Sequence, residues 1–191
     1  MNIPTLYSCR GGFGFRKLVR RDLPALSELK AETWSSTHTA TIVNSEDQDR
    51  WFDSMQTDVN QPTKLFLTLT AAADSSTEAI GFFKIANVDY INRTADVGWD
   101  LLAAYRGKGI GQVLVTGGAS FCFNFLNLRR LTAEILATNV ASQRRAESAG
   151  FVMEGVKQEA VYVRIPYKHG PLSTGTSYVD SQIWGLLAGQ S

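Results

Sequence analysis

The chain has 191 residues, 44% of them hydrophobic and 19% charged, which suits one globular domain that buries its own core. A net charge of +1 gives no sign of the basic face that binds nucleic-acid phosphates, and no apolar stretch approaches the roughly 20 residues that span a bilayer. Cys9 and Cys122 lie far apart, which favours a reducing compartment over a disulfide framework. We therefore expect a cytoplasmic protein with no nucleic-acid or membrane partner and a flexible segment over residues 1–14.

Alternating and amphipathic patterns predict the elements of the first half of the chain. An apolar run over residues 13–19 indicates a first strand, and Asp22, with Pro24 in the first turn, begins a helix that runs to about Thr33. After an irregular loop over 34–44, Ser45 opens a second helix with the spacing of a capping box. The next runs predict a hairpin and one further strand, at residues 64–70, 79–88 and 95–101.

Residues 105–111, Tyr-Arg-Gly-Lys-Gly-Ile-Gly, predict a glycine-rich turn between a strand and a helix. The glycines at 107, 109 and 111 let the backbone come close to a ligand, and the first amides of a helix have no partners within it. The positive end of the helix dipole, together with Arg106 and Lys108, would favour a pyrophosphate there. A plain surface turn is the alternative, because three glycines near a lysine also occur by chance.

The second half of the chain predicts two more helices and three strands. Apolar residues at helical spacing indicate a helix from Ile110 to near Asn127, and an alternating run over 131–137 indicates a strand. Glu134 lies on the polar face of that strand. Asn139 can cap a short helix that ends at Gly150, and strands at 152–163 and 178–187 close the chain around a long connection.

This order of elements resembles the GNAT superfamily of acetyl-CoA-dependent N-acetyltransferases. Arg106, Gly109 and Gly111 fill the places of that family's turn motif. The Asn139-x-x-Ser142 spacing and the segment 147–151, Glu-Ser-Ala-Gly-Phe, resemble the RimJ/RimL-type branch, although Ser148 stands where lysine is usual. The resemblance implies one GNAT domain over residues 1–191 with an α/β (α+β) fold. Its mixed sheet would have about seven strands, splayed at the middle and flanked by about four helices.

The resemblance also implies acetyl-CoA as the cofactor, with no metal. In this family the pantetheine arm pairs with exposed backbone of the splayed strand, which here is the backbone of Trp99, Asp100, Leu101 and Leu102. The pyrophosphate would lie on the turn and the start of the next helix, which comprise Arg106, Gly107, Lys108, Gly109, Ile110, Gly111 and Gln112. Asn139 and Ser142 would face the cofactor from the other side, and Arg145 would bind its 3'-phosphate.

Catalysis in this family is the direct attack of an uncharged amine on the thioester. Glu134 lies where some protein Nα-acetyltransferases place a general base, and Glu159 and Asp96 are the alternatives. Ala146 stands where many relatives have a tyrosine that protonates the leaving thiolate. The acid is therefore expected to be Ser142, solvent or no group at all, because a thiol with a pKa of about 8.5 needs little help to leave.

A primary amine is the expected acceptor, with a protein N-terminus first because of the RimJ/RimL-type resemblance. An amino sugar carried on a nucleotide, or another small-molecule amine, is the first alternative. A non-catalytic module that only binds acetyl-CoA is the second. The acceptor pocket is expected around the loop that holds Trp34 and His38 and around Trp51 and Phe52. A homodimer formed through the last two strands or a helix face is a further expectation.

Overall fold

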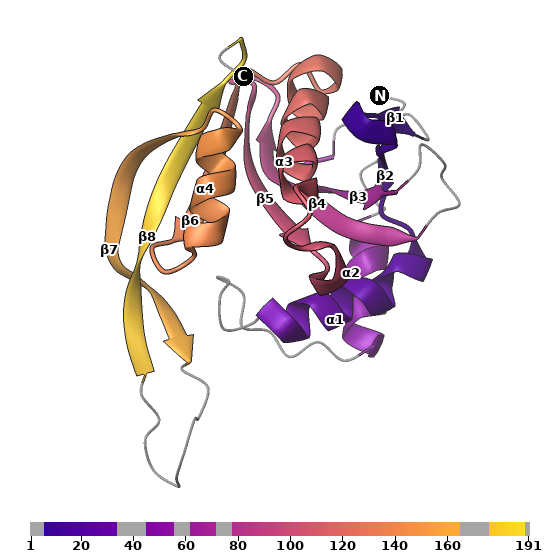
Figure 1. Ribbon diagram of the computed structural model, residues 1–191, viewed down its shortest axis with the longest axis horizontal. Helices are drawn as coiled ribbons and strands as arrows, with labels where there is room; N and C mark the ends of the chain where they lie inside the picture. Colours follow the sequence, from indigo (N-terminus) through magenta and orange to yellow (C-terminus); the bar gives the residue numbers. More distant parts are fainter. Residues whose placement is uncertain (1–5, 34–44, 56–61, 72–77, 165–175, 190–191) are drawn as a thin grey trace, which may run out of the picture.

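Figure 1 shows the computed structural model, which describes residues 6–33, 45–55, 62–71, 78–164 and 176–189. One mixed sheet carries eight strands in the order β1-β2-β3-β4-β5-β6-β8-β7. The strands are β1 (Tyr7–Ser8), β2 (Gly14–Lys17), β3 (Leu65–Thr70), β4 (Ala79–Asp89), β5 (Thr94–Leu101), β6 (Arg130–Leu136), β7 (Val152–Arg164) and β8 (Thr176–Leu187). The four α-helices are α1 (Leu23–Thr33), α2 (Ser45–Ser54), α3 (Ile110–Ser120) and α4 (Val140–Ser148). The expected mixed sheet and four helices are confirmed.

The sheet separates between β5 and β6, its one parallel pair of neighbours among the described strands. Their pairing extends only from Thr94 opposite Arg130 to Asp96 opposite Thr132. Beyond that point β5 stays paired with β4 as far as Leu101, and β6 stays paired with β8 as far as Leu136. The two halves of the sheet therefore diverge, as Figure 1 shows, and the backbone of β5 after Asp96 has no ladder partner on its β6 side. This is the splay that the sequence resemblance implied.

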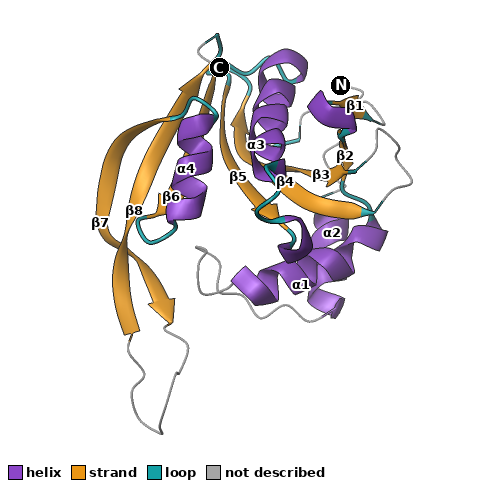
Figure 2. Ribbon diagram, in the orientation of Figure 1, coloured by secondary structure: helices purple, strands orange, loops and turns teal. Residues whose placement is uncertain are grey.

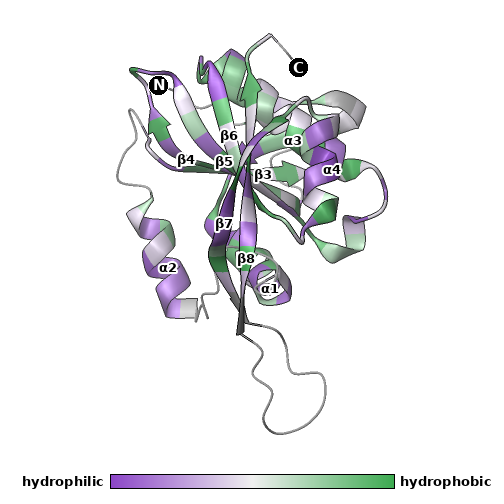
Figure 3. Ribbon diagram, turned by 90° about the vertical axis from the view of Figure 1, so that its left-hand side faces the viewer, coloured by the Kyte–Doolittle hydropathy of each residue, from purple (hydrophilic) through white to green (hydrophobic). Residues whose placement is uncertain are grey.

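Helices cover both faces of the sheet (Figure 2). On one face, α3 buries Leu114 and Val115 in the larger core, and it approaches β4 so closely that a Cβ on Gly118 would lie 2.3 Å from the ring of Phe83. On the other face, α1 and α2 form a smaller core with Phe82 of β4. Helix α2 is hydrophilic along most of its length (Figure 3). Its Phe52 is buried in the smaller core. The sheet thus has one hydrophobic core on each face. The gap between β5 and β6 interrupts the sheet itself.

The N-terminal segment is described from residue 6 onward, and Tyr7–Ser8 pairs with β2 in the antiparallel sense. That residues 1–14 form a flexible segment stays a prediction. The Tyr7 hydroxyl lies 2.9 Å from Ser120 Oγ at the end of α3, and its ring meets Phe121 edge-on at 5.4 Å. A strand of two residues carries no periodicity, so the sequence alone gave no signal for β1.

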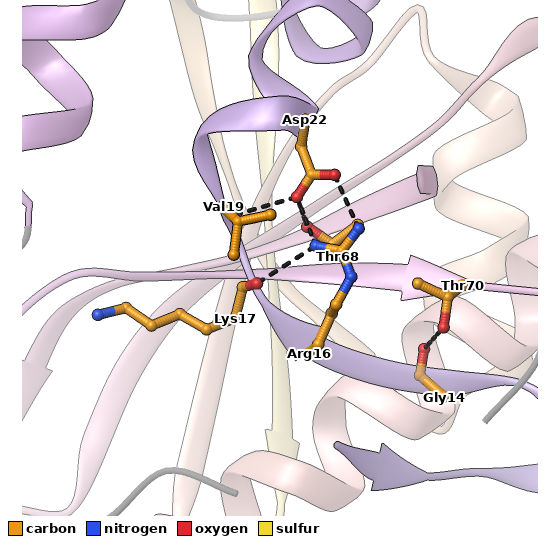
Figure 4. Close-up of polar contacts among 7 residues, drawn as sticks. All are labelled: Gly14, Arg16, Lys17, Val19, Asp22, Thr68 and Thr70. Atoms are coloured by element: carbon orange, nitrogen blue, oxygen red, sulfur yellow. Dashed lines mark hydrogen bonds and ion pairs between the residues drawn. The ribbon is translucent and has the colours of Figure 1, made fainter. Parts of the chain in front are cut away.

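A buried ion pair fixes the start of α1 to the sheet (Figure 4). Both terminal nitrogens of the Arg16 guanidinium donate to Asp22, at 2.6 and 2.8 Å, and each residue is only 3% exposed. The same carboxylate accepts from Thr68 Oγ1 of β3 and from the amide of Val19. Asp22 was expected as a local helix start. The structure adds that its carboxylate joins α1 to β2 and β3.

Helix α3 continues into a π-helical segment at Phe121–Phe125, so the expected helix to near Asn127 is confirmed almost to its end. Asn127 has a φ of 54°, in the left-handed region that ends helices. The chain then enters β6, which brings Glu134 and the start of α4 alongside β5.

Candidate active site

A cavity of about 570 Å³ lies in the gap between β5 and β6. Its walls are the diverging parts of these two strands, and the first turn of α4, one residue of β8 and residues of β4 and β7 complete them. Its polar lining includes carboxylates, lysines and hydroxyls, contributed by Lys84, Asp96, Asp100, Thr132, Glu134, Ser142 and Lys157. The cavity therefore brings together residues that the sequence had placed on five separate elements.

The glycine-rich turn leads into α3 at the end of the sheet where β5 and β6 have separated (Figure 1). Gly107 and Gly109 both have φ of 76°, and a Cβ added to either would meet nothing within 4 Å. Among the described residues, no acceptor is found for the amides of Lys108 through Gly111. Arg145 reaches over from α4, with Nε 2.5 Å from the position of a Cβ on Gly111. Free amides and a guanidinium thus meet at one open surface, as an anion site requires.

Three other residues of this segment stabilise the turn itself. Arg106 donates from Nε to the carbonyl of Leu101 at 2.9 Å and from a terminal nitrogen to Glu32 of α1 at 3.0 Å. Gln112 donates to the carbonyl of Ser148, which joins α3 to the end of α4. The Lys108 ammonium lies 5.7 Å from the ring centre of Tyr105. The side chains of Arg106 and Gln112, which were predicted to bind the cofactor, here make contacts within the protein.

Asn139 caps α4, as its residue type predicts. Its Oδ1 accepts from the amide of Ser142 at 3.1 Å. Both residues also line the cavity, so the two residues of this capping bond form part of the cavity wall. Position 146 of this helix is an alanine, so no tyrosine hydroxyl is available there. The Ala146 side chain is fully buried in the core.

The three carboxylates proposed as bases differ in their surroundings. Glu134 lines the cavity and forms an ion pair with Lys157, whose Nζ lies 2.9 Å from Oε2. Asp96 also lines the cavity and accepts from Asn87 at 2.8 Å. Glu159 lies in an irregular stretch of β7, with φ of 45°, and is absent from the cavity lining.

Asp100 is a carboxylate whose side chain the sequence did not single out, because only its backbone was expected to act. Burial raises the pKa of Asp100 to about 6, against the opposing effect of Arg106, Lys84, Lys30 and Arg145. No hydrogen bond to its carboxylate is made by any described residue. The indole Nε1 of neighbouring Trp99, a second cavity residue, is likewise buried without an acceptor in the described structure.

Residues 13–152 match the sequence profile of the family described as "Acetyltransferase (GNAT) domain". The chain belongs to the GNAT acetyltransferase family. The resemblance to the GNAT superfamily and the fold it implied are thus confirmed, because the match covers both the splayed strands and the turn before α3. The RimJ/RimL-type branch stays a prediction.

Individual relatives are similar to this GNAT chain over different lengths. Spermidine N(1)-acetyltransferase of Vibrio cholerae is 25% identical over 95 residues, which is 50% of this chain and 55% of the relative. This chain thus spans only about half the length of the curated relatives it matches. A crystal structure of spermidine N-acetyltransferase from Vibrio cholerae, solved with CoA and spermine, covers 95% of this chain and 98% of its own, with a TM-score of 0.79 and 20% identity.

A second solved structure is RimL, a ribosomal L7/L12 α-N-protein acetyltransferase in complex with coenzyme A. It covers 97% of this chain and 99% of its own, with a TM-score of 0.78 and 17% identity. At these identities the two solved structures support the fold alone. Each of the two solved structures shares this fold with nearly the whole of the chain.

Several expected acceptor residues lie outside the described residues, namely Trp34, His38 and the rest of the 34–44 loop. Trp51 and Phe52 are described and pack in the smaller core with Phe66 and Phe82. The described residues contain no cluster of three or more His, Cys, Asp or Glu side chains suited to a metal. Within the same ranges, every helix is too short or too polar to cross a bilayer.

Proposed function

We propose that this protein is an N-acetyltransferase that moves an acetyl group from acetyl-CoA to a primary amine within a ternary complex. The observation that carries the proposal is the gap between β5 and β6. It combines unpaired strand backbone, a lined cavity and two helix starts at the same end of the sheet. Membership of the GNAT family supports the same reading.

The residues present fit coenzyme A. The free amides at the start of α3 and the guanidinium of Arg145 would hold phosphates there. The backbone of β5 after Asp96, which has no partner on its β6 side, would pair with the pantetheine arm through Trp99 to Leu102. The buried indole N–H of Trp99 offers a further donor. When bound, acetyl-CoA supplies the activated thioester.

Glu134 and Ser142 are the proposed catalytic residues, because both line the cavity. Glu134, which is paired with Lys157, would accept a proton released from the amine nitrogen through water. Ser142 would donate its hydroxyl proton to the leaving sulfur and recover it from solvent. Since no tyrosine occupies position 146, the serine or solvent takes this role.

The acceptor that we propose is the α-amine of a protein N-terminus, as in the RimJ/RimL-type branch. An α-amine with a pKa of about 8 costs roughly 1 kcal/mol to deprotonate at neutral pH, whereas a lysine-like amine near 10.4 costs roughly 4 to 5 kcal/mol. The resemblance of the Asn139-x-x-Ser142 spacing and of residues 147–151 to this branch supports that acceptor. A polyamine is the second candidate, because the local sequence match is to a spermidine N(1)-acetyltransferase.

A panel of amines separates these candidates. The purified full chain is mixed with acetyl-CoA and, in turn, with a peptide bearing a free N-terminus, spermidine and an amino-sugar nucleotide, and free thiol is followed. We expect the peptide α-amine to be acetylated with the highest kcat/KM. A preference for spermidine would move the assignment to polyamines, and coenzyme A binding with no product from any acceptor would indicate a non-catalytic module.

We also propose that two copies associate through the β7–β8 hairpin in the cytoplasm. Strand β7 is at the edge of the sheet, and apolar side chains on the hairpin are exposed, among them Val152, Val156, Tyr162 and Tyr178. Exposed apolar side chains along an unpaired edge strand favour association with another chain. The two free cysteines are consistent with a reducing compartment.

A further inference from the structure

Asp100 lies on the face of β5 that is turned toward α1. Successive residues of a strand alternate between faces, so Asp96, Gly98 and Asp100 share one face, while Trp99 packs on Phe151 on the other. The residue directly opposite Asp100 is Phe82 of β4, which belongs to the smaller core beneath α1 and α2. The Asp100 side chain is therefore on the opposite face of the sheet from α3 and α4.

Open space adjoins this carboxylate. A Cβ added to Gly98, two residues before Asp100 on the same face, would meet no heavy atom within 4 Å. Lys84 stands directly opposite Gly98 on β4, and all three residues line the cavity. A ligand lying over Gly98 would thus have Asp100 on one side and Asp96 on the other.

Four cations act electrostatically on the Asp100 carboxylate and oppose the effect of burial on its pKa. They are Lys30 of α1, Lys84 of β4, Arg106 of the turn and Arg145 of α4. None of them forms an ion pair with it within 4.0 Å among the described residues. Further along the cavity, Asp96 is bonded to Asn87 and Glu134 is paired with Lys157. Asp100 is therefore the cavity carboxylate with no direct partner in the described structure.

We propose that Asp100 is the base that takes the first proton from the acceptor's ammonium group, a role that rests on the proposed acetyl transfer. A primary ammonium must lose one proton before it can attack and a second afterwards. The Asp100 carboxylate accepts the first and passes it to solvent, which leaves a neutral amine. The amine nitrogen then forms the N–C bond as the C–S bond breaks and its electron pair leaves on sulfur. Glu134 receives the second proton, and sulfur is protonated by Ser142 or water.

The basicity of Asp100 fits this task and points to a class of acceptor. Its pKa of about 6 is close to the working pH, where a general base is most effective. Proton transfer from an α-amine with a pKa near 8 is unfavourable by only about 100-fold, whereas transfer from an amine near 10.4 is unfavourable by more than about 10,000-fold. Asp100 therefore favours α-amines over lysine-like or polyamine nitrogens.

The test compares the wild type with Asp100→Asn, and uses Asp89→Asn as the matched control, because Asp89 lies at the end of β4 and does not line the cavity. We expect the wild-type kcat/KM for a peptide α-amine to fall on the acid side with a midpoint near pH 6. Asp100→Asn should remove that midpoint and lower kcat/KM at pH 7.5 by about 100-fold or more. Asp89→Asn should keep the midpoint. Coenzyme A affinity, measured by calorimetry, should change less than about twofold in both variants, because only backbone of residue 100 is expected to meet the cofactor.

A second readout does not depend on turnover. Carbon NMR of the free wild type should show one aspartate carboxyl that titrates near pH 6, and this signal should be missing from Asp100→Asn. The inference is overturned if Asp100→Asn keeps the acid midpoint while the wild type turns over, or if no carboxyl titrates near 6. A wild type that binds coenzyme A but acetylates no amine contradicts the proposed function instead.

Discussion

At the scale of single residues, two carboxylates of this protein differ in what surrounds them. Asp22 accepts two bonds from Arg16 and further bonds from Thr68 and the amide of Val19. Asp100 receives no hydrogen bond from a described residue, and burial raises its pKa to about 6 against the opposing effect of nearby cations. The first arrangement stabilises the fold, and the second lowers stability while keeping a basic group at the cavity.

The first prediction concerns the stability cost of Asp100. A folded-state pKa raised from 3.8 means that the folded protein binds this proton more tightly than the unfolded chain. The destabilisation is therefore absent below pH 3.8, grows between pH 3.8 and 6, and is complete above pH 6. We expect Asp100→Asn to raise the free energy of unfolding at pH 7.5 by about 1 to 3 kcal/mol.

Urea unfolding of both proteins across this pH range measures the effect. The difference between them should shrink as the pH falls from 6 toward 4. Equal stability at pH 7.5, or a gain that does not change with pH, would contradict the assigned surroundings of Asp100.

A second prediction concerns the buried ion pair. Asp22→Ala leaves the guanidinium of Arg16, which is 3% exposed, without its carboxylate, so the free energy of unfolding should drop by about 3 to 5 kcal/mol. The matched control is Asp49→Ala, which removes an exposed carboxylate from Arg20 and should cost about 1 kcal/mol or less. Similar losses in the two variants, measured by urea unfolding, would show that Asp22 does not anchor α1.

At the scale of elements, the anion site depends on how α4 meets the start of α3. The Arg145 side chain occupies the space that a Cβ on Gly111 would need, with contacts of 2.5 Å to Nε and 2.9 Å to Cδ. Gly111→Ala should displace the guanidinium and weaken coenzyme A binding about tenfold, the effect of losing one charge-assisted contact.

Calorimetry on a double-mutant cycle tests this third prediction. Arg145→Ala should match Gly111→Ala, and the double variant should bind no worse than either, because both changes remove the same contact. Thr116→Ala, an exposed position on α3 outside this surface, should leave the affinity unchanged. Additive losses in the cycle would mean that Arg145 does not act at the start of α3.

Local patterns predicted most of the elements. The helix from Asp22, the Asn139 cap and the turn before Ile110 follow from residue types within a few positions of one another. The orientation of Arg106 could not be predicted this way, since its partner Glu32 lies 74 residues away. The raised pKa of the Asp100 side chain could not be predicted for the same reason, because the charged residues that act on it come from α1, β4 and α4.

At the scale of the whole molecule, the decisive feature is where one sheet divides. No pattern within β5 or β6 specifies that their pairing stops at Asp96 and Thr132, and only the family resemblance implied it. The sequence predicted neither β1 nor the neighbouring order of β8 and β6, because both depend on distant segments meeting. The family resemblance therefore predicted the architecture of the site, whereas the arrangement of its charged side chains was found only in the structure.

A fourth prediction concerns association of two copies. Tyr162 and Tyr178 are 45% and 62% exposed, and their rings meet at 5.5 Å on the hairpin. Sedimentation of the wild type should show a species of twice the monomer mass, and the Tyr162→Lys/Tyr178→Lys double variant should shift it to monomer. A wild type that stays monomeric at high concentration would remove the hairpin from consideration as an interface.

The most direct test of the whole account is the stoichiometry of acetyl transfer by the full chain. Labelled acetyl-CoA is incubated with a peptide that has a free N-terminus, and acetylated peptide and released thiol are quantified together. We predict one acetylated α-amine for each thiol released, with loss of both in Gly109→Trp, whose side chain would fill the open turn before α3. Thiol release without acetylated amine, or coenzyme A binding with neither product, would contradict the assignment of this protein as an amine acetyltransferase.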